Sequence, residues 1–407
     1  MAQGKSGRIV LEIDPVLKRR LHAELSYTGV SMKEWFIRQA TNFLDIPSNN
    51  YVCDVSEEYR VQSHSDEIKE RKTMSKASVI SMFSGCGGMD LGFRGDFDFL
   101  GDFYADRPFD IVWANDLNKD ACKTYKQNLD DIIREGDVWA HLDSMPESVD
   151  VVIGGFPCQD ISVNGKRAGV AGERSGLYRA MVEAIRKTRP KIFVAENVKG
   201  LLMEYNKKSL EAVFNDFSSL GYNVAYQLYR AADYGVPQLR DRVFIVGTRP
   251  DVSLFRAPIP THSKLDWVSC EQALHDLEWK EEDVAFNHIW SRAKKSPEQG
   301  NRHLKADRPG HTIRAECHGN IQFHYKLPRR ISMREAARIQ SFPDSFIFSS
   351  GLRAIERQIG NAVPPVLAWH MAGAVAECLG NGILKAGPNF ETNDRRASNP
   401  LQNYQLA

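Results

Sequence analysis

Five short apolar segments, separated by stretches of helical character, constrain the fold of this chain more than any other feature. They are VISMFSG (79–85), DIVWAND (110–116), VDVVIGG (149–155), KIFVAENV (191–198) and RVFIVGT (242–248). Apolar runs of this length are typical of strands buried on both faces, and the helical patterns between several of them indicate crossover connections. We therefore predict an α/β fold with a doubly wound, mostly parallel sheet, in which all five segments run parallel.

Changes in composition divide the rest of the chain. The sheet-forming domain is predicted over 77–250, and a basic, loop-rich domain over 251–328. Helical patterns return at SMREAARIQ and PPVLAWHMAGAVAECL, so we predict a return to the first domain over 329–384. The last residues, 385–407, are predicted to be a disordered tail, and 46–76 are polar and predicted to be a linker.

Residues 1–45 have a pattern of their own. GRIVLEID alternates apolar and polar residues and predicts a strand, and two helices follow, the second with a capping box at Ser31 and Glu34. This β-α-α order resembles a ribbon-helix-helix module, which dimerises by pairing its strands and binds DNA. We expect a homodimer through 1–45; the alternative is a small appendage that only assists folding.

Composition excludes several classes of protein. No apolar run approaches the ~20 residues that span a bilayer, and the N-terminus lacks a signal peptide, so we expect a cytoplasmic protein with no membrane partner. The seven cysteines are scattered and form no CxxC pair, which argues against disulfides and against a metal site.

A glycine-rich turn and two carboxylates predict a cofactor site at the ends of the first strands. Phe83-Ser84-Gly85-Cys86-Gly87 follows the first strand, and Asp116-Leu117 ends the second. Such a turn lets a ligand approach the backbone closely, and such a carboxylate accepts hydrogen bonds from a ribose. Asp137, followed by Val138, is either an acceptor for an adenine amine or a turn aspartate. No phosphate-binding Gly-Lys-Ser/Thr follows the turn, which favours S-adenosylmethionine, a nucleoside cofactor without phosphate.

The strongest motif is Gly154-Gly155-Phe156-Pro157-Cys158-Gln159, at the end of the third strand. A thiolate there would face the cofactor crevice on a turn stiffened by Pro157. Cytosine C5 attacks a sulfonium methyl group only after a nucleophile has added to C6, and a cysteine thiolate is accessible near neutral pH and leaves again by elimination. Cys158 is the predicted nucleophile.

The next strand ends supply the partners that this reaction needs. Glu196 is placed to bond N3 and the exocyclic amine of the base, which promotes attack at C6. Arg240 and Arg242 lead into RVFIVGT, where they could hold O2 of the base, orient Glu196 or contact phosphate. Any one of these groups alone could be a structural ion pair.

These motifs, in this order, resemble those of the C5-cytosine DNA methyltransferase family. The matching segments are FSGCGG, GFPCQDIS, AENVKG, QLRDRVFIVG, REAARIQSFPDSF and IGNAVPP, within about 77–380. The resemblance implies a class I S-adenosylmethionine-dependent methyltransferase that acts on a flipped cytosine in double-stranded DNA, with Cys158, Glu196, Arg240 and Arg242 as catalytic residues. It implies a cofactor site made by Phe83, Ser84, Gly85, Cys86, Gly87, Asp116, Leu117, Asp137, Val138, Pro157 and Asn361. Two departures are small: Asp116 stands where Glu is common, and Ile161 where Phe is usual.

Two further segments gain a meaning from the resemblance. The glycine-rich segment 162–178 corresponds to the part of these enzymes that closes over the flipped base. The region 251–328 corresponds to the target-recognition domain. Between positions 286 and 330 stand ten Lys/Arg against three Asp/Glu, which favours phosphate contact but also fits a solvated face. Arg314 is one candidate for reading guanine.

Two alternatives to a DNA methyltransferase are a tRNA-methylating enzyme and a transcriptional regulator. The related tRNA-methylating branch carries a Cys-Phe-Thr tripeptide in the target region, and this chain has none. A transcriptional regulator with a decayed enzyme domain would not keep Cys158, Glu196 and both arginines. We expect a modification enzyme of a bacterial or phage restriction–modification system that also regulates its own gene. A cognate restriction endonuclease would act on the same DNA site without binding to this chain.

Overall fold

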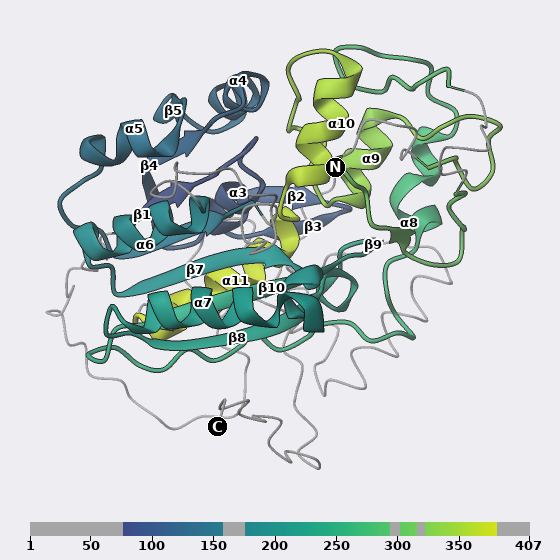
Figure 1. The fold of residues 1–407 in the computed structure, drawn as a ribbon. Helices are drawn as coiled ribbons and strands as arrows, with labels where there is room; N and C mark the ends of the chain where they lie inside the picture. The colour runs from purple at the N-terminus through teal and green to yellow at the C-terminus, as the bar shows by residue number, and fades with distance from the viewer. Residues whose placement is uncertain (1–75, 158–175, 294–301, 316–321, 381–407) are drawn as a thin grey trace, which may run out of the picture. The chain divides into compact units, whose positions relative to one another are not determined.

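A computed structural model describes residues 76–157, 176–293, 302–315 and 322–380 of the chain (Figure 1). The chain divides into two units, Met1–Lys72 and Thr73–Ala407, and all the described residues belong to the second. The predicted N-terminal module, the linker, the tail and Cys158 lie outside the described residues.

A seven-stranded sheet forms the centre of this unit, in the order β5-β4-β1-β6-β7-β10-β8. The strands are β1 (Ala77–Met82), β4 (Phe109–Asp116), β5 (Ile133–Glu135), β6 (Val151–Gly155), β7 (Ile192–Val198), β8 (Asn223–Arg230) and β10 (Asp241–Thr248). From β1 the chain proceeds outward through β4 and β5, and then returns to β6 and β7 on the other side of β1. This reversal between β1 and β6 is the switch point at which such sheets bind ligands. The predicted doubly wound, mostly parallel α/β fold is therefore confirmed.

Helices cover both faces of the sheet (Figure 1). One face carries α3 (Gly88–Arg94), α4 (Lys119–Asn128) and α11 (Pro365–Cys378), and the other carries α6 (Leu177–Thr188) and α7 (Lys207–Ser218). Strand β7 shows why the first four residues of such a strand, Ile192 to Ala195, are all apolar. Ile192 and Val194 pack into the core on the α11 side, while Phe193 and Ala195 pack on the α6 side.

The direction of β10 corrects the prediction that all five apolar segments are parallel. β10 pairs antiparallel with β7 and also with β8, with Arg242 opposite Val198 and Phe244 opposite Glu196. The link from β8 to β10 contains a short 3-10 helix (Ala231–Tyr234) and β9 (Gln238–Leu239), and it has no crossover helix to return the chain to the other edge. As a result, the start of β10 lies at the same edge of the sheet as the ends of β1, β6 and β7.

Several elements were not predicted. β8 is largely exposed, so its sequence carries no apolar run. β5 has only three residues, and β2 (Phe97–Phe99) and β3 (Asp102–Tyr104) form a small separate hairpin. Short elements of this kind leave little periodicity in a sequence.

The region after Thr248 is mostly loop in the described part. It contains the short helix α8 (Cys270–Leu274) and the two-residue strand β11 (Gly310–His311), which pairs in parallel with β9. The two predicted C-terminal helices are confirmed as α9 (Met333–Ile339) and α11, with α10 (Leu352–Asn361) between them. One further short helix, α5 (Val138–His141), follows β5 in the sheet domain. No helix among the described residues is long and apolar enough to cross a membrane.

Candidate active site

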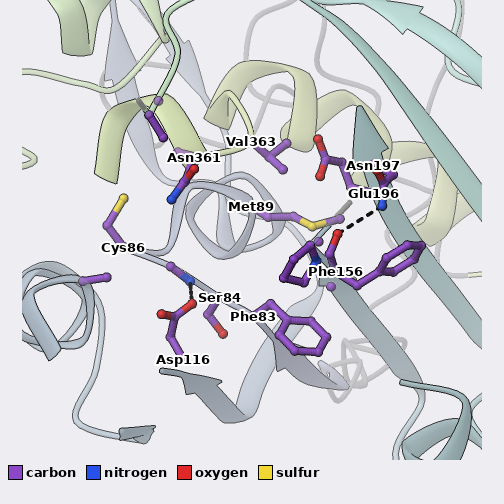
Figure 2. Close-up of a pocket in the computed structure, with 18 of the residues that line it drawn as sticks. Phe83, Ser84, Cys86, Met89, Asp116, Phe156, Glu196, Asn197, Asn361 and Val363 are labelled. Atoms are coloured by element: carbon purple, nitrogen blue, oxygen red, sulfur yellow. Dashed lines mark hydrogen bonds between the residues drawn. The ribbon is translucent and has the colours of Figure 1, made fainter. Parts of the chain in front are cut away.

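The strand ends surround one cavity of about 1070 Å³. It brings together most of the residues predicted from sequence: Phe83, Ser84, Gly85, Cys86, Asp116, Leu117, Asp137, Val138, Pro157, Glu196, Arg240, Arg242 and Asn361. Gly87 is not among the lining residues. Figure 2 shows the β1 turn, Asp116, Phe156, Glu196 and Asn361 arranged around this space. The volume is at the upper end of the range of small-molecule sites, so it is large enough for a nucleoside cofactor.

The turn after β1 is held in place by Asp116 (Figure 2). Asp116 Oδ2 accepts a hydrogen bond from the Gly85 amide at 2.8 Å, and Oδ1 accepts one from the Asn118 amide at 2.8 Å. Gly85 has a φ of 58°, and a Cβ there would meet no atom within 4 Å. Burial raises the pKa of Asp116, and its two amide hydrogen bonds oppose that shift.

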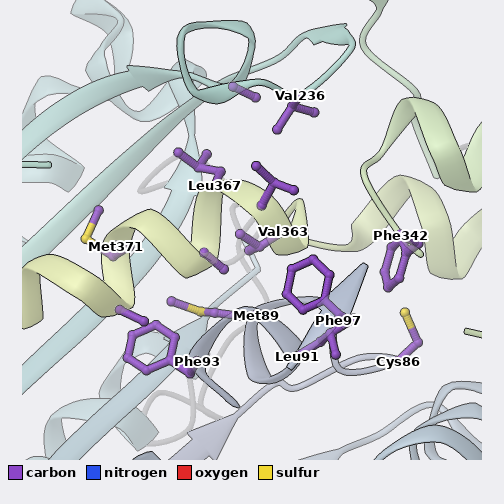
Figure 3. Packing of buried hydrophobic residues seen from close by; sticks show 14 of the residues in the cluster. Cys86, Met89, Leu91, Phe93, Phe97, Val236, Phe342, Val363, Leu367 and Met371 are labelled. Carbon is purple, nitrogen blue, oxygen red and sulfur yellow. The ribbon is translucent and has the colours of Figure 1, made fainter. Parts of the chain in front are cut away.

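Gly87 and Cys86 have roles in packing beneath the turn. Gly87 has a φ of 93°, and a Cβ there would lie 2.3 Å from Leu129 Cδ1. The Cys86 side chain is buried among the core residues near Phe342 (Figure 3), and its thiol donates to the Gln358 carbonyl at 3.8 Å. Burial, reinforced by the charge of Asp116, raises the pKa of this thiol. Cys86 is therefore not a thiolate nucleophile.

Asp137 and Leu117 also line the cavity. Asp137 caps α5, with Oδ1 accepting from the Trp139 amide at 3.1 Å. Asp137 is therefore a turn and capping aspartate that also lines the cavity, and its role as an acceptor for an adenine amine stays a prediction. Leu117 is 74% exposed and Val138 is buried.

Glu196 and Arg242 form a buried ion pair at the end of β7. Arg242 Nε lies 2.7 Å from Glu196 Oε1, and each residue is less than a tenth exposed. The two residues are diagonal neighbours on one face of the antiparallel pair, because Glu196 lies opposite Phe244, two residues after Arg242. Burial lowers the pKa of the Arg242 guanidinium, and the Glu196 carboxylate opposes that shift. Of the three roles considered for the arginines, orienting Glu196 is the one whose contact is present for Arg242.

The second carboxylate oxygen of Glu196 faces the end of β6. A Cβ added to Gly155 would lie 3.0 Å from Glu196 Oε2, so glycine at this position leaves room beside that oxygen. Asn197, which was not among the predicted site residues, donates from Nδ2 to the Phe156 carbonyl at 3.0 Å (Figure 2). This bond ties the Glu196 strand to the turn that leads through Pro157 to Cys158. The sequence signal that could have identified Asn197 was its place in the motif AENVKG, directly after Glu196.

Arg240 makes different contacts. Its guanidinium is almost completely buried and donates to three main-chain carbonyls, those of Ile313, Gly360 and Ala362, at 2.9–3.0 Å. Its Nε has no hydrogen-bond partner in the described part of the chain. Arg240 therefore joins β10 to the segment after β11 and to the end of α10. Burial, with Arg242 nearby, lowers its pKa well below the usual range.

The segment Thr312, Ile313, Arg314 and Ala315 lines the same cavity, although it comes from the predicted target-recognition region. Gln238 assists Arg240 in holding it, since its Oε1 accepts from the Ile313 amide at 3.0 Å. Gly360 allows the close approach, because a Cβ there would lie 2.5 Å from the Ala315 nitrogen. Arg314, the candidate for reading guanine, thus reaches the cavity. Gln238 and Gly360 were missed, although both lie inside the quoted motifs.

The described residues hold no group of three His, Cys, Asp or Glu side chains that could bind a metal. A glycine turn, acceptor carboxylates and a buried Glu–Arg pair at the switch point of a doubly wound sheet define a class I methyltransferase fold.

Comparisons with known proteins identify the family. The sequence model of the family described as C-5 cytosine-specific DNA methylase matches residues 77–377 of this chain. The Type II methyltransferase M.NgoFVII of Neisseria gonorrhoeae is 36% identical over 76% of this chain and 89% of its own length. M.BsuRI of Bacillus subtilis is 32% identical over 81% of this chain and 86% of its own length. The chain belongs to the C-5 cytosine-specific DNA methylase family, and it is a DNA (cytosine-5-)-methyltransferase.

Solved structures agree on the fold. The S. pombe Dnmt2 methyltransferase has a TM-score of 0.56, with 17% identity over 74% of this chain and 98% of that chain. The Entamoeba histolytica methyltransferase EhMeth has a TM-score of 0.52, with 14% identity over 74% of this chain and 98% of that chain.

Proposed function

We propose that this enzyme methylates C5 of a flipped cytosine in duplex DNA through a covalent bond between Cys158 and C6, with S-adenosylmethionine as methyl donor. The observation that carries the proposal is the Glu196–Arg242 pair, 2.7 Å apart, in the cavity that also contains Pro157 and the glycine turn. Glu196 lies opposite Gly155, three residues before Cys158, which supports a role for its carboxylate on the ring that the thiolate attacks.

The cavity residues fit the proposed cofactor. Phe83 offers an aromatic face for adenine, and Asp116 and Asp137 keep acceptor capacity for hydroxyl and amine groups. The open space beside Gly85 admits a ligand against the backbone. Asn361, the last residue of α10, also lines the cavity. When bound, S-adenosylmethionine supplies an electrophilic methyl group on its sulfonium.

The proposed chemistry balances around the pyrimidine ring. The Cys158 thiolate forms a bond to C6, and the electron pair of the C5–C6 bond moves into the ring, towards N3. Glu196 stabilises N3 and bonds the exocyclic amine, while Arg242 holds the carboxylate in register. The electron pair at C5 then forms the bond to the methyl group, and the pair of the broken carbon–sulfur bond stays on the donor's sulfur, which leaves as a neutral thioether. Loss of the C5 proton to a base and expulsion of the thiolate restore the aromatic ring and free Cys158.

The four cysteines that the structure describes are poor candidates for the nucleophile, which supports the assignment of that role to Cys158. Cys86, Cys122, Cys270 and Cys378 are all buried. Burial raises the pKa of Cys122 and Cys270 to about 12 and that of Cys378 to about 11. A thiol with so high a pKa is almost entirely protonated near neutral pH.

We assign Arg240 a positioning role rather than direct contact with the base. Its two terminal nitrogens are used by three carbonyls, and these carbonyls belong to the segment carrying Arg314 and to the turn carrying Asn361. Arg240 thereby sets the distance between the target-recognition segment and the cofactor side of the cavity.

We further propose that the enzyme is the modification component of a type II restriction–modification system, since its relatives are named Type II methyltransferases. The N-terminal β-α-α module would regulate transcription of the enzyme's own gene as a dimer. The cognate endonuclease would share the DNA site without binding this chain, and the enzyme would work in the cytoplasm of a bacterium or a phage-infected cell.

Two experiments test the mechanism in sequence. Bisulfite sequencing of DNA from expressing cells identifies the methylated cytosine and its context. A duplex with 5-fluorocytosine at that position should then trap a covalent adduct, which mass spectrometry should map to Cys158. Cys158→Ser should form no adduct, whereas Cys378→Ser, at a buried site away from the cavity, should trap normally. An adduct at Cys53 or Cys317, or no methylated cytosine in the cells, would contradict the proposal.

A further inference from the structure

A chain of hydroxyl and carboxyl groups runs beneath the glycine turn. Tyr125 Oη donates to Asp90 Oδ1 at 2.9 Å, and Ser81 Oγ donates to Asp90 Oδ2 at 3.0 Å. Ser84 Oγ lies 2.9 Å from Ser81 Oγ and 3.0 Å from the Ser81 carbonyl. The chain therefore begins in the core and ends at Ser84, a residue that lines the cavity.

The carboxyl group at the centre of this chain is unusual because it is completely buried. Asp90 is 0% exposed, Tyr125 is 0% exposed and Ser81 is 1% exposed. A buried carboxylate costs free energy unless its oxygens are hydrogen-bonded, and here each oxygen has one donor. Asp90 and Ser81 both border the cavity, but Asp90 has no exposed surface and its carboxylate oxygens accept from Ser81 and Tyr125. Its side chain is therefore linked to the glycine turn through Ser81 and Ser84.

We infer that Asp90 is a positioning residue for cofactor binding: through Ser81 its carboxylate holds Ser84 and the glycine turn in the conformation that receives S-adenosylmethionine. The inference rests on the proposed cofactor site and adds to it a fully buried residue of the cavity wall. It also explains why a charged group is placed where an apolar one would pack at lower cost.

An ionised carboxylate is required because it only accepts hydrogen bonds. With both hydroxyl protons directed at Asp90, the oxygen of Ser81 keeps a free lone pair for the proton of Ser84. A neutral carboxylic acid or an amide would donate one hydrogen bond itself. Either Ser81 or Tyr125 would then have to accept this hydrogen bond and direct its own proton elsewhere. For Ser81, that proton would turn towards Ser84 Oγ and compete with the hydrogen bond that Ser84 now donates, which would weaken the hold on the turn.

The charge surroundings make the protonation of Asp90 measurable. Burial raises the pKa of Asp90 from its ordinary value of 3.8 to about 6, while the hydrogen bonds from Ser81 and Tyr125 and the charge of Arg94 oppose the shift. The titratable groups that face it are Arg94 on α3, Tyr125 on α4 and Cys86 in the turn. The folded-state pKa lies above the unfolded one, so the stabilising contribution of Asp90 is present below its unfolded pKa and is lost as pH rises through about 6.

The test compares binding of S-adenosylmethionine by wild type, Asp90→Asn and Ser81→Ala, using calorimetry on the full chain across pH. At about pH 8 both variants should bind about five-fold more weakly, the loss of roughly one hydrogen bond. Near pH 5, where the wild-type carboxyl is also neutral, the ratio of dissociation constants for Asp90→Asn and wild type should approach one. Because Asp116 titrates equally in both proteins, it cancels from this ratio. Tyr125→Phe removes one hydrogen bond to Asp90 but keeps the Ser81 link, so this variant should bind S-adenosylmethionine normally at about pH 8. Loss of that hydrogen bond raises the pKa of Asp90, so as the pH falls the variant should lose affinity at a higher pH than wild type does.

Thermal unfolding distinguishes positioning from damage to the fold. At about pH 8 Asp90→Asn should melt at or above the wild-type temperature, because the cost of burying a charge is removed. Equal affinity of Asp90→Asn and wild type at about pH 8 would overturn the inference. A lower melting temperature with the same loss of affinity at every pH would also overturn it. Failure of the wild-type enzyme itself to bind S-adenosylmethionine would instead refute the proposed cofactor site.

Discussion

Arg242 Nε lies 2.7 Å from Glu196 Oε1, and this contact exists because the strand carrying Arg242 runs antiparallel to the strand carrying Glu196. A parallel strand would begin at the opposite edge of the sheet, and both arginines would lie far from the cavity. The antiparallel direction instead brings the planar guanidinium against one oxygen of the carboxylate, while the other oxygen faces Gly155.

Replacing Glu196 by Gln should reduce methyl transfer by about a hundred-fold or more, because an amide cannot supply the proton or the charge that N3 requires. Binding of S-adenosylmethionine should remain close to wild type, since the cofactor residues lie on other strands. Single-turnover transfer of labelled methyl and calorimetry measure the two quantities. Turnover within a few-fold of wild type would show that the carboxylate is structural.

Replacing Arg242 by Lys keeps the charge but loses the planar geometry that fixes Glu196. We expect kcat to fall by about a hundred-fold, as for a misplaced catalytic group, with little change in cofactor affinity. Arg249→Lys is the matched control, because Arg249 forms a similar Nε contact with Asp251 beyond the other end of β10, on the surface. If both variants lose the same activity, the effect belongs to the sheet and not to Glu196.

Gly360→Ala should destabilise the fold by about 1–3 kcal/mol through overpacking. The added Cβ would lie 2.5 Å from the Ala315 nitrogen and the Arg314 carbonyl carbon, which are main-chain atoms. We also expect a higher KM for DNA, because the displaced segment carries Arg314. Gly351→Ala, at the start of the same helix, has open space around its Cβ and should change neither quantity. Chemical denaturation and steady-state kinetics give both values.

Deleting residues 1–70 should leave methylation largely unchanged, because the deletion lies within Met1–Lys72, while the sheet and cavity belong to the separate unit Thr73–Ala407. The truncated protein should sediment as a monomer and should no longer repress the promoter of its own gene. Full-length protein that sediments as a monomer at micromolar concentration would exclude the proposed dimerising module.

Much of the site could be predicted because its residues follow strands directly. Asp116, Pro157 and Glu196 each stand at the carboxyl end of an apolar run, and the ends of parallel strands meet at one edge. Arg240 shows where this reasoning stops. Its motif places it beside Arg242, yet its guanidinium turns to three carbonyls that come from Ile313, Gly360 and Ala362.

The sequence by itself determined the fold class, the order of the motifs and the chemistry they can perform, because apolar periodicity and strand-end residues are local features. The tertiary structure decided the direction of β10, the partner of each arginine, the entry of Arg314 into the cavity and the contact of Asp90 with Tyr125 of α4. Each of these depends on segments tens to hundreds of residues apart in the chain, and their contacts are set by packing and hydrogen-bond satisfaction in the folded core.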